Sequence, residues 1–119
     1  MTGITINSRR CGYVHEVSGK IDGNKVIIEI DTLCNVVKNI SRMEVPLEGI
    51  LGIKDNYVLE KASHAPCCDT CLVPCAVLHL CRLEAGYMSK SLVKDVGNIS
   101  IEFKSISLTS LSFIRNKGN

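Results

Sequence analysis

The sequence predicts an α+β fold: an N-terminal β-hairpin in a small mixed sheet, two to four helices packed on one face, and a C-terminal strand. Three observations indicate it. Alternating apolar residues flank Asp22-Gly23, apolar residues recur at helical spacing in two later segments, and "NISIEF" alternates again near the end. The length of 119 residues is enough for one domain with its own core. We place this single α+β domain at residues 1–107 and expect a loosely ordered tail at 108–119.

The first segments are predicted strands. "GITIN" alternates weakly, and "YVHEVSGKI" and "KVIIEI" form the two arms of the hairpin. With Asp22-Gly23 as a two-residue loop, the numbers of opposed residues sum to 45, which keeps the apolar residues on one face, whereas a sum of 46 mixes the faces. If pairing continues to the mouth of the hairpin, Cys11 lies opposite Cys34, with Cβ atoms about 4.5 to 5.5 Å apart.

The middle of the chain is predicted to be helical. An apolar stripe over residues 33–43 follows Asp31 and Thr32, either of which can cap a helix. "VPLEGILG" and "NYVLEKASH" are ambiguous and are interpreted as two short helices. A further helix is expected from Pro74 to about Met88, because proline is tolerated in the first turn of a helix.

Composition excludes several classes of function. A net charge of +2, no block of Lys and Arg, no Trp and few Phe or Tyr predict no nucleic-acid partner. No run approaches the roughly 20 apolar residues of a membrane span, so no membrane partner is expected. The seven cysteines cannot all pair, and no secretory signal is visible, which favours a cytoplasmic protein with reduced thiols. No phosphate-binding loop or nucleophile elbow is present, and whether the protein is an enzyme stays open.

The segment "HAPCCDTCLVPC", residues 64–75, holds four of the cysteines. Cys34 and Cys71 each precede or open a predicted helix, where the helix dipole favours a thiolate. With Cys11 they are expected to converge on one edge of the sheet. The natural guests of such an edge are a zinc ion, an iron-sulfur cluster, or a second sulfur in a redox cycle. The candidate ligands are Cys11, Cys34 and Cys71, with a further ligand from His64, Cys67, Cys68 and Cys75.

Other interpretations stay beside this one. The spacing Cys68-x2-Cys71-x3-Cys75 resembles a cluster-binding loop without the common ferredoxin spacings, and the C-x-x-C within it lacks the βαβ context of a thioredoxin motif. Cys81 is expected to fill the core. Cys75, His79 and Arg82 share the outer side of a helix, which is more often simply a polar face, and His15 is expected to be a half-buried sheet residue.

Several short motifs carry a resemblance to a known family. They are "CGY" at residues 11–13, Cys34 at a helix start, His64 followed by Cys71-Leu-Val-Pro74, then "EAG" and "VKDVGNISIE". Over about residues 4–104 the chain resembles a family of small proteins of unknown function from methanogenic archaea and anaerobic bacteria. The resemblance implies that Cys11, Cys34, His64, Cys71 and Pro74 are family-type positions. It also implies that the remaining cysteines are additions of this chain: Cys67, Cys68, Cys75 and Cys81.

Three functions therefore remain open. The first is a protein that binds a metal ion or iron-sulfur centre through thiolates, and the second is a thiol-disulfide redox protein that uses Cys11, Cys34 and Cys71. In both cases a protein partner for metal or electron transfer is expected. The third is a non-catalytic interaction domain whose cysteines fill space. The sequence favours the first and predicts no particular oligomeric state.

Overall fold

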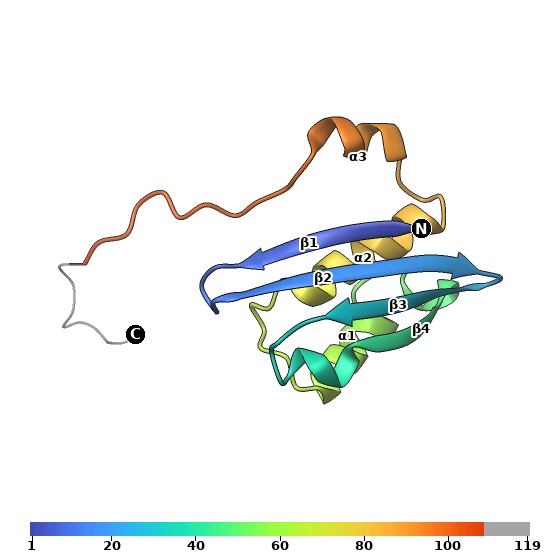
Figure 1. Ribbon diagram of the computed structural model, residues 1–119, viewed down its shortest axis with the longest axis horizontal. Helices are drawn as coiled ribbons and strands as arrows, with labels where there is room; N and C mark the ends of the chain where they lie inside the picture. The colour runs from blue at the N-terminus through green and yellow to red at the C-terminus, as the bar shows by residue number, and fades with distance from the viewer. Residues whose placement is uncertain (109–119) are drawn as a thin grey trace.

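The computed structural model describes residues 1–108, and it shows a four-stranded sheet with helices on one face (Figure 1). The sheet is a meander of order β1-β2-β3-β4, and every neighbouring pair is antiparallel. The strands are β1 (Thr2–Ser8), β2 (Tyr13–Asp22), β3 (Lys25–Asp31) and β4 (Arg42–Pro46). The helices are α1 (Tyr57–His64), α2 (Val73–Glu84) and α3 (Lys90–Val96), with short 3-10 helices η1 (Val37–Ile40) and η2 (Leu47–Gly49). The α+β class is confirmed, but the sheet is purely antiparallel rather than mixed.

The β2–β3 hairpin is present, but its predicted register is wrong. Its loop consists of Gly23 and Asn24, and Asp22 pairs with Lys25, so opposed residues sum to 47. Gly23 has a φ of 66°, and a two-residue hairpin loop often takes glycine at this first position. A shift of two residues keeps every side chain on its own face. Alternation, which excludes a sum of 46, therefore cannot distinguish 45 from 47.

This register changes the expected position of two cysteines. Pairing between β2 and β3 ends with Glu16 opposite Asp31, so Cys11 and Cys34 lie outside the ladder and do not face each other as strand partners. Cys11 instead lies in the turn that joins β1 to β2, and Cys34 lies just after β3. Both turns are nevertheless at the same end of the sheet, because β1 and β3 run in the same direction within the antiparallel meander.

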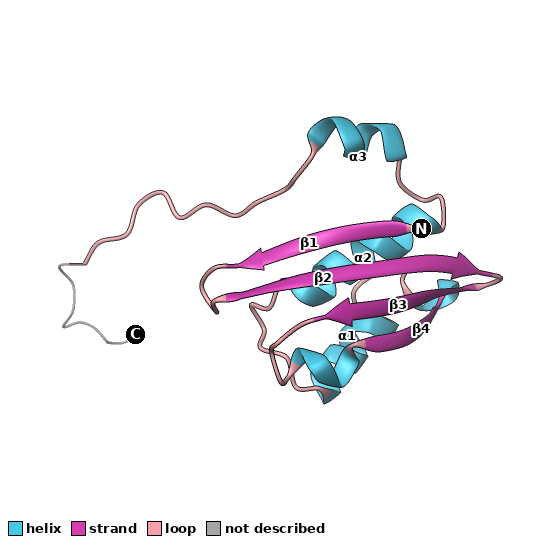
Figure 2. Cartoon of the chain, in the orientation of Figure 1, coloured by secondary structure: helices cyan, strands magenta, loops and turns pink. Residues whose placement is uncertain are grey.

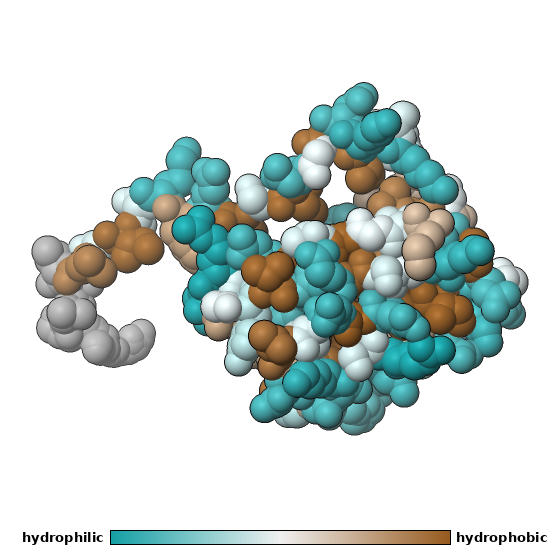
Figure 3. Space-filling model, in the orientation of Figure 1, coloured by the Kyte–Doolittle hydropathy of each residue, from teal (hydrophilic) through white to brown (hydrophobic). Residues whose placement is uncertain are grey.

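The core lies between the sheet and two helices. α2 packs against β1 and β2, and α1 packs against β4, so both cover the same face, as expected (Figure 2). Alternate strand residues such as Val17, Ile28 and Val45 are buried there, and Val77 and Leu80 of α2 pack against the same cluster. The other face of the sheet is open, and hydrophilic side chains are prominent on it among scattered apolar ones (Figure 3).

The helix predicted over residues 33–43 is wrong. Only residues Val37–Ile40 form a helical turn, of the 3-10 type, and β4 begins at Arg42. Of its apolar residues, Val37, Ile40 and Met43 are buried, Met43 from a strand that pairs with β3. Leu33 and Val36 are exposed. A short apolar run fits either a helix or a strand, and here pairing with the sheet decides.

The second half of the chain follows the sequence more closely. Asn56 caps α1 by accepting hydrogen bonds from the backbone N–H groups of Val58 and Leu59. "VPLEGILG" is not the short helix that was predicted, because its first two residues end β4 and only Leu47–Gly49 form the 3-10 helix η2. α2 starts with Pro74 in its first turn, as predicted. α2 ends at Glu84 rather than near Met88. No helix of the described residues is long and apolar enough to cross a membrane.

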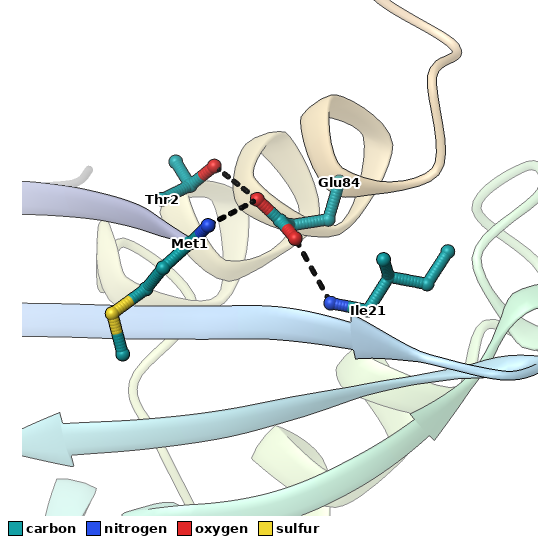
Figure 4. A network of polar contacts seen from close by, with 4 residues as sticks. All are labelled: Met1, Thr2, Ile21 and Glu84. Atoms are coloured by element: carbon teal, nitrogen blue, oxygen red, sulfur yellow. Dashed lines mark hydrogen bonds and ion pairs between the residues drawn. The ribbon is translucent and has the colours of Figure 1, made fainter.

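A buried carboxylate fixes the end of α2. Glu84, whose side chain is 5% exposed, accepts hydrogen bonds from the Thr2 hydroxyl at 2.5 Å and from the Ile21 backbone N–H at 2.9 Å (Figure 4). The N-terminal ammonium lies 3.8 Å from the same carboxylate. Burial favours a higher pKa, but the two hydrogen bonds and the positive charges outweigh it and lower the pKa of Glu84. The C-terminus of α2 is thereby held where β1 starts and β2 ends.

The C-terminal strand predicted from "NISIEF" is not formed. Residues 98–104 have no regular secondary structure and do not belong to the sheet. They follow α3, which the sequence analysis did not predict. Ser89 caps α3 by accepting a hydrogen bond from Leu92 N, and the helix buries none of its residues. Of the expected tail, residues 109–119 lie outside the described residues.

Candidate cysteine site

Three connections meet at the end of the sheet opposite Glu84. They are the β1–β2 turn with Cys11, the segment after β3 with Cys34, and residues 65–72 between α1 and α2. Arg10 Nη2 in the first connection donates a hydrogen bond to Thr70 Oγ1 in the third, at 2.7 Å. Asn39 Nδ2 donates to the carbonyl oxygen of Ala65 at 2.8 Å and so ties the second connection to the third. Segments far apart in the sequence are thus joined around the cysteines.

The thiols of the three connections affect one another electrostatically. The pKa of Cys71 is raised, first by burial and then by the thiols of Cys68, Cys34 and Cys11, while a hydrogen bond from the Val73 backbone N–H opposes the rise. A pKa that responds to a neighbouring charge requires a short separation. Cys71 is therefore within electrostatic range of thiols from all three connections.

Cys67 belongs to the same group. Burial is the main reason that its pKa is raised to about 11, followed by the charge of Cys71, a hydrogen bond with the Cys71 thiol, and the nearby Cys34 and Cys68. We define the cysteine cluster as the five residues linked in this way: Cys11, Cys34, Cys67, Cys68 and Cys71. The raised pKa values indicate that Cys67 and Cys71 are protonated at neutral pH in the metal-free protein.

The cluster lies at the border between core and solvent. Cys34, Cys67 and Cys71 are half-buried and pack against the hydrophobic core, whereas Cys11 and Cys68 are exposed. The inner thiols are thus anchored and partly shielded, and the outer ones are accessible to a ligand or a partner.

A buried polar pair supports the Cys34 segment. His15 Nδ1 lies 2.8 Å from Thr32 Oγ1, and the same hydroxyl accepts a hydrogen bond from the Cys34 backbone N–H at 3.0 Å. His15 is only 2% exposed, more buried than expected, and burial lowers its pKa. Sequence reasoning missed this role. The available signal was that His15 shares the core face of β2 with Val17.

The other predicted site residues lie outside the cluster. His64 is exposed at the end of α1, and within residues 1–108 no described interaction joins it to a thiol. Cys75 is exposed on α2, with its Sγ 3.7 Å from His79 Nδ1, and that nitrogen is 2.9 Å from the Cys75 carbonyl oxygen. Cys81 is fully buried and its pKa is raised to about 12 by burial, as expected for a core residue.

The side chains are not arranged as a finished metal site. Among the described residues, no group of three or more His, Cys, Asp or Glu side chains is placed to hold a metal ion. All seven cysteines are free. The structure thus brings thiols together from separate segments, and the assignment of a zinc or iron-sulfur ligand set stays a prediction.

Fold and site together define a small α+β protein with a thiol cluster at one end of an antiparallel meander. The chain belongs to a family of unknown function (DUF6951), whose model matches residues 2–96. The match covers the sheet and all three α-helices. No curated protein and no solved structure matches the chain. Membership of a family of unknown function is therefore confirmed, while its range of organisms and its cysteine pattern stay predictions.

Proposed function

We propose that the protein binds a thiophilic metal ion or an iron-sulfur centre through thiolates of the cysteine cluster. The observation that carries the proposal is that hydrogen bonds from Arg10 to Thr70 and from Asn39 to Ala65 join the three connections that hold the cysteine cluster. Cysteine thiolates are the preferred ligands of zinc and of iron-sulfur centres.

Binding in this proposal requires deprotonation and local rearrangement. A metal ion must displace the protons of thiols such as Cys67, whose pKa is about 11. Metal affinity is then steeply dependent on pH, and binding releases protons. All five thiols lie in connections rather than in strands or helices. Their side chains can therefore turn toward a metal without disturbing the sheet.

The raised pKa values argue against a thiolate nucleophile as the main function. A reactive cysteine has a lowered pKa and is therefore a thiolate near neutral pH. Burial instead raises the pKa of both Cys67 and Cys71. One observation keeps thiol redox chemistry as a second candidate, because the Cys71 thiol contributes to the raised pKa of Cys67 and the two residues lie in the same connection. Oxidation to a disulfide would release two protons and pass two electrons to a partner disulfide.

A compartment and a partner contact for the protein follow from the reduced state and the exposure of its thiols. Reduced thiols persist in a reducing compartment, so we assign the protein to the cytoplasm. Cys11 and Cys68 are the exposed members of the cluster. They are the positions at which a partner protein would reach the bound metal or exchange electrons.

The test is metal and acid-labile sulfide analysis, with absorption spectra, on protein purified without oxygen. Cys71→Ser is compared with Cys75→Ser, because Cys75 is a cysteine outside the cluster on the neighbouring helix. We expect stoichiometric metal in the parent and in Cys75→Ser, and loss of metal in Cys71→Ser with unchanged circular dichroism.

A titration with Zn²⁺ at about pH 8 completes the test, because protons compete less with the metal for the thiolates at this pH than at neutral pH. Protein that is isolated without metal and does not bind zinc in this titration would remove the proposal. The next experiment would then be a thiol redox titration, with the Cys67–Cys71 pair as the first candidate.

A further inference from the structure

The segment that follows α3 has the pattern of a strand without a partner in the sheet. In residues 98–104, which we call the C-terminal arm, Ile99, Ile101 and Phe103 alternate with polar residues and are 71%, 75% and 75% exposed. Figure 3 shows apolar side chains along this extended part of the chain. Three large apolar side chains in strict alternation are the signature of a strand that covers a core. The arm lies beyond the residues matched by the family model.

The sheet offers an edge of the same length. β1 is seven residues long, as is the arm, and within residues 1–108 it pairs only with β2. The core face of β1 carries Ile4 and Ile6. Ile6 is buried, but Ile4 is only half-buried. The apolar face of the sheet therefore continues to an edge that is incompletely covered, and unpaired edges are templates for strand addition.

The arm and this edge are complementary in pattern. In a strand beside β1, Ile99, Ile101 and Phe103 would extend the apolar face formed by Ile4 and Ile6. The intervening Ser100, Glu102 and Lys104 would then lie on the open, largely hydrophilic face. The apolar face of the added strand thus adjoins the apolar face of the sheet, and its polar face adjoins the hydrophilic face.

We propose that the arm of one chain pairs with β1 of a second copy, and that a reciprocal exchange forms a twofold dimer. In Figure 1 the segment after α3 runs in the same direction as the β1 arrow, continues past the end of that strand and leads away from its own sheet. Pairing within one chain would therefore be parallel, in a sheet whose other pairs are all antiparallel. A twofold-related copy supplies the antiparallel direction, which is the more stable pairing.

The exposed side of α3 fits the same arrangement. Its apolar residues Leu92 and Val96 are 61% and 54% exposed, and the helix directly precedes the arm. When the arm adds to a second sheet, α3 is brought beside that sheet edge. Its apolar side chains then cover the core face of the added strand, as α2 covers β1 in the first copy.

The test measures mass in solution by light scattering on the full chain, over a range of concentrations and with a reductant that prevents disulfide cross-links. We expect about twice the chain mass of 13.0 kDa. Ile101→Glu places a charge on the apolar side of the arm and should weaken the dimer at least tenfold. Ser100→Glu, on the other side, is the matched control and should leave the dimer intact.

Isotope-filtered NMR on a mixture of labelled and unlabelled chains identifies the contact. Cross-peaks between Phe103 of one chain and Ile4 of another are expected. A monomer at every concentration, with the arm either free or folded back on its own β1, would overturn the proposal. A dimer that survives Ile101→Glu, or that lacks the Phe103–Ile4 cross-peaks, would also overturn it because the contact would lie elsewhere.

Discussion

Gly19 allows α2 to approach the sheet, and its replacement by alanine gives a sharp test of the packing. A Cβ at this position would lie 2.5 Å from Leu80 Cδ2 and 2.8 Å from Ile28 Cδ1. Carbon atoms in contact are normally about 3.5 to 4.0 Å apart, so each overlap is about 1 Å. Both neighbours are fully buried and closely packed, and neither can move away without displacing others.

The expected cost of Gly19→Ala follows from these contacts. Overpacking in a core typically costs about 1 to 3 kcal/mol, and the lower chain entropy of alanine returns about 0.5 to 1 kcal/mol. We therefore expect a net loss of about 1 to 2 kcal/mol in the free energy of unfolding. For a domain of this size the Tm falls by roughly 4 to 8 °C.

The assay is urea and thermal unfolding followed by circular dichroism, with Gly3→Ala as the matched control. Gly3 is on the neighbouring strand, where a Cβ would come no closer than 3.9 Å to the Val17 carbonyl oxygen. This variant should be as stable as the parent or slightly more stable. If Gly19→Ala behaved like Gly3→Ala, the close packing of α2 on β2 would be refuted.

Three further predictions concern titration and reactivity. The lowered pKa of Glu84 adds stability that is complete above the unfolded value of 4.5 and is lost as the pH falls below it, so in urea melts Glu84→Gln should flatten this acid-side slope. The lowered pKa of His15 likewise means that stability declines as the pH falls below 6.5, and His15→Gln should remove that decline; an unchanged slope would contradict the burial of the ring. In alkylation followed by mass spectrometry, Cys11 and Cys68 should react in the native protein and Cys81 only after unfolding, since Cys81 is buried and its pKa is raised to about 12; native labelling of all three at one rate would disprove it.

The sequence predicted what depends on local pattern. Alternation located the hairpin strands and their core face, and apolar spacing with Pro74 located α2. The prediction from sequence failed where pairing between separate segments decides the structure. The hairpin register was off by two residues, which alternation cannot detect. Met43 lies in a strand and not in the predicted helix, because its segment pairs with β3. α3 was missed because it has only seven residues, too few for helical spacing to distinguish it from a loop.

The structure places the candidate cysteines in a different way from that suggested by the sequence, and their role as ligands stays a prediction. Cys11 and Cys34 were expected to be near each other as strand partners, and both instead contribute to the charge around Cys71 from separate turns. Cys67 and Cys68 join them, although no helical or strand periodicity could place residues of an irregular connection. The expected place of His64 beside the thiols is not seen among the described interactions, because α1 ends with that side chain exposed.

The order of the strands has a consequence for synthesis and folding. Each strand pairs with its neighbour in the chain, so the sheet is complete at Pro46, before the connection with Cys67 and Cys71 has left the ribosome. Such sequence-local contacts favour early and rapid formation. Cys11 and Cys34 are then already fixed at one end of a preformed hairpin array when the later thiols arrive. Maturation of the cluster is therefore expected as the last step of folding, after α2 docks.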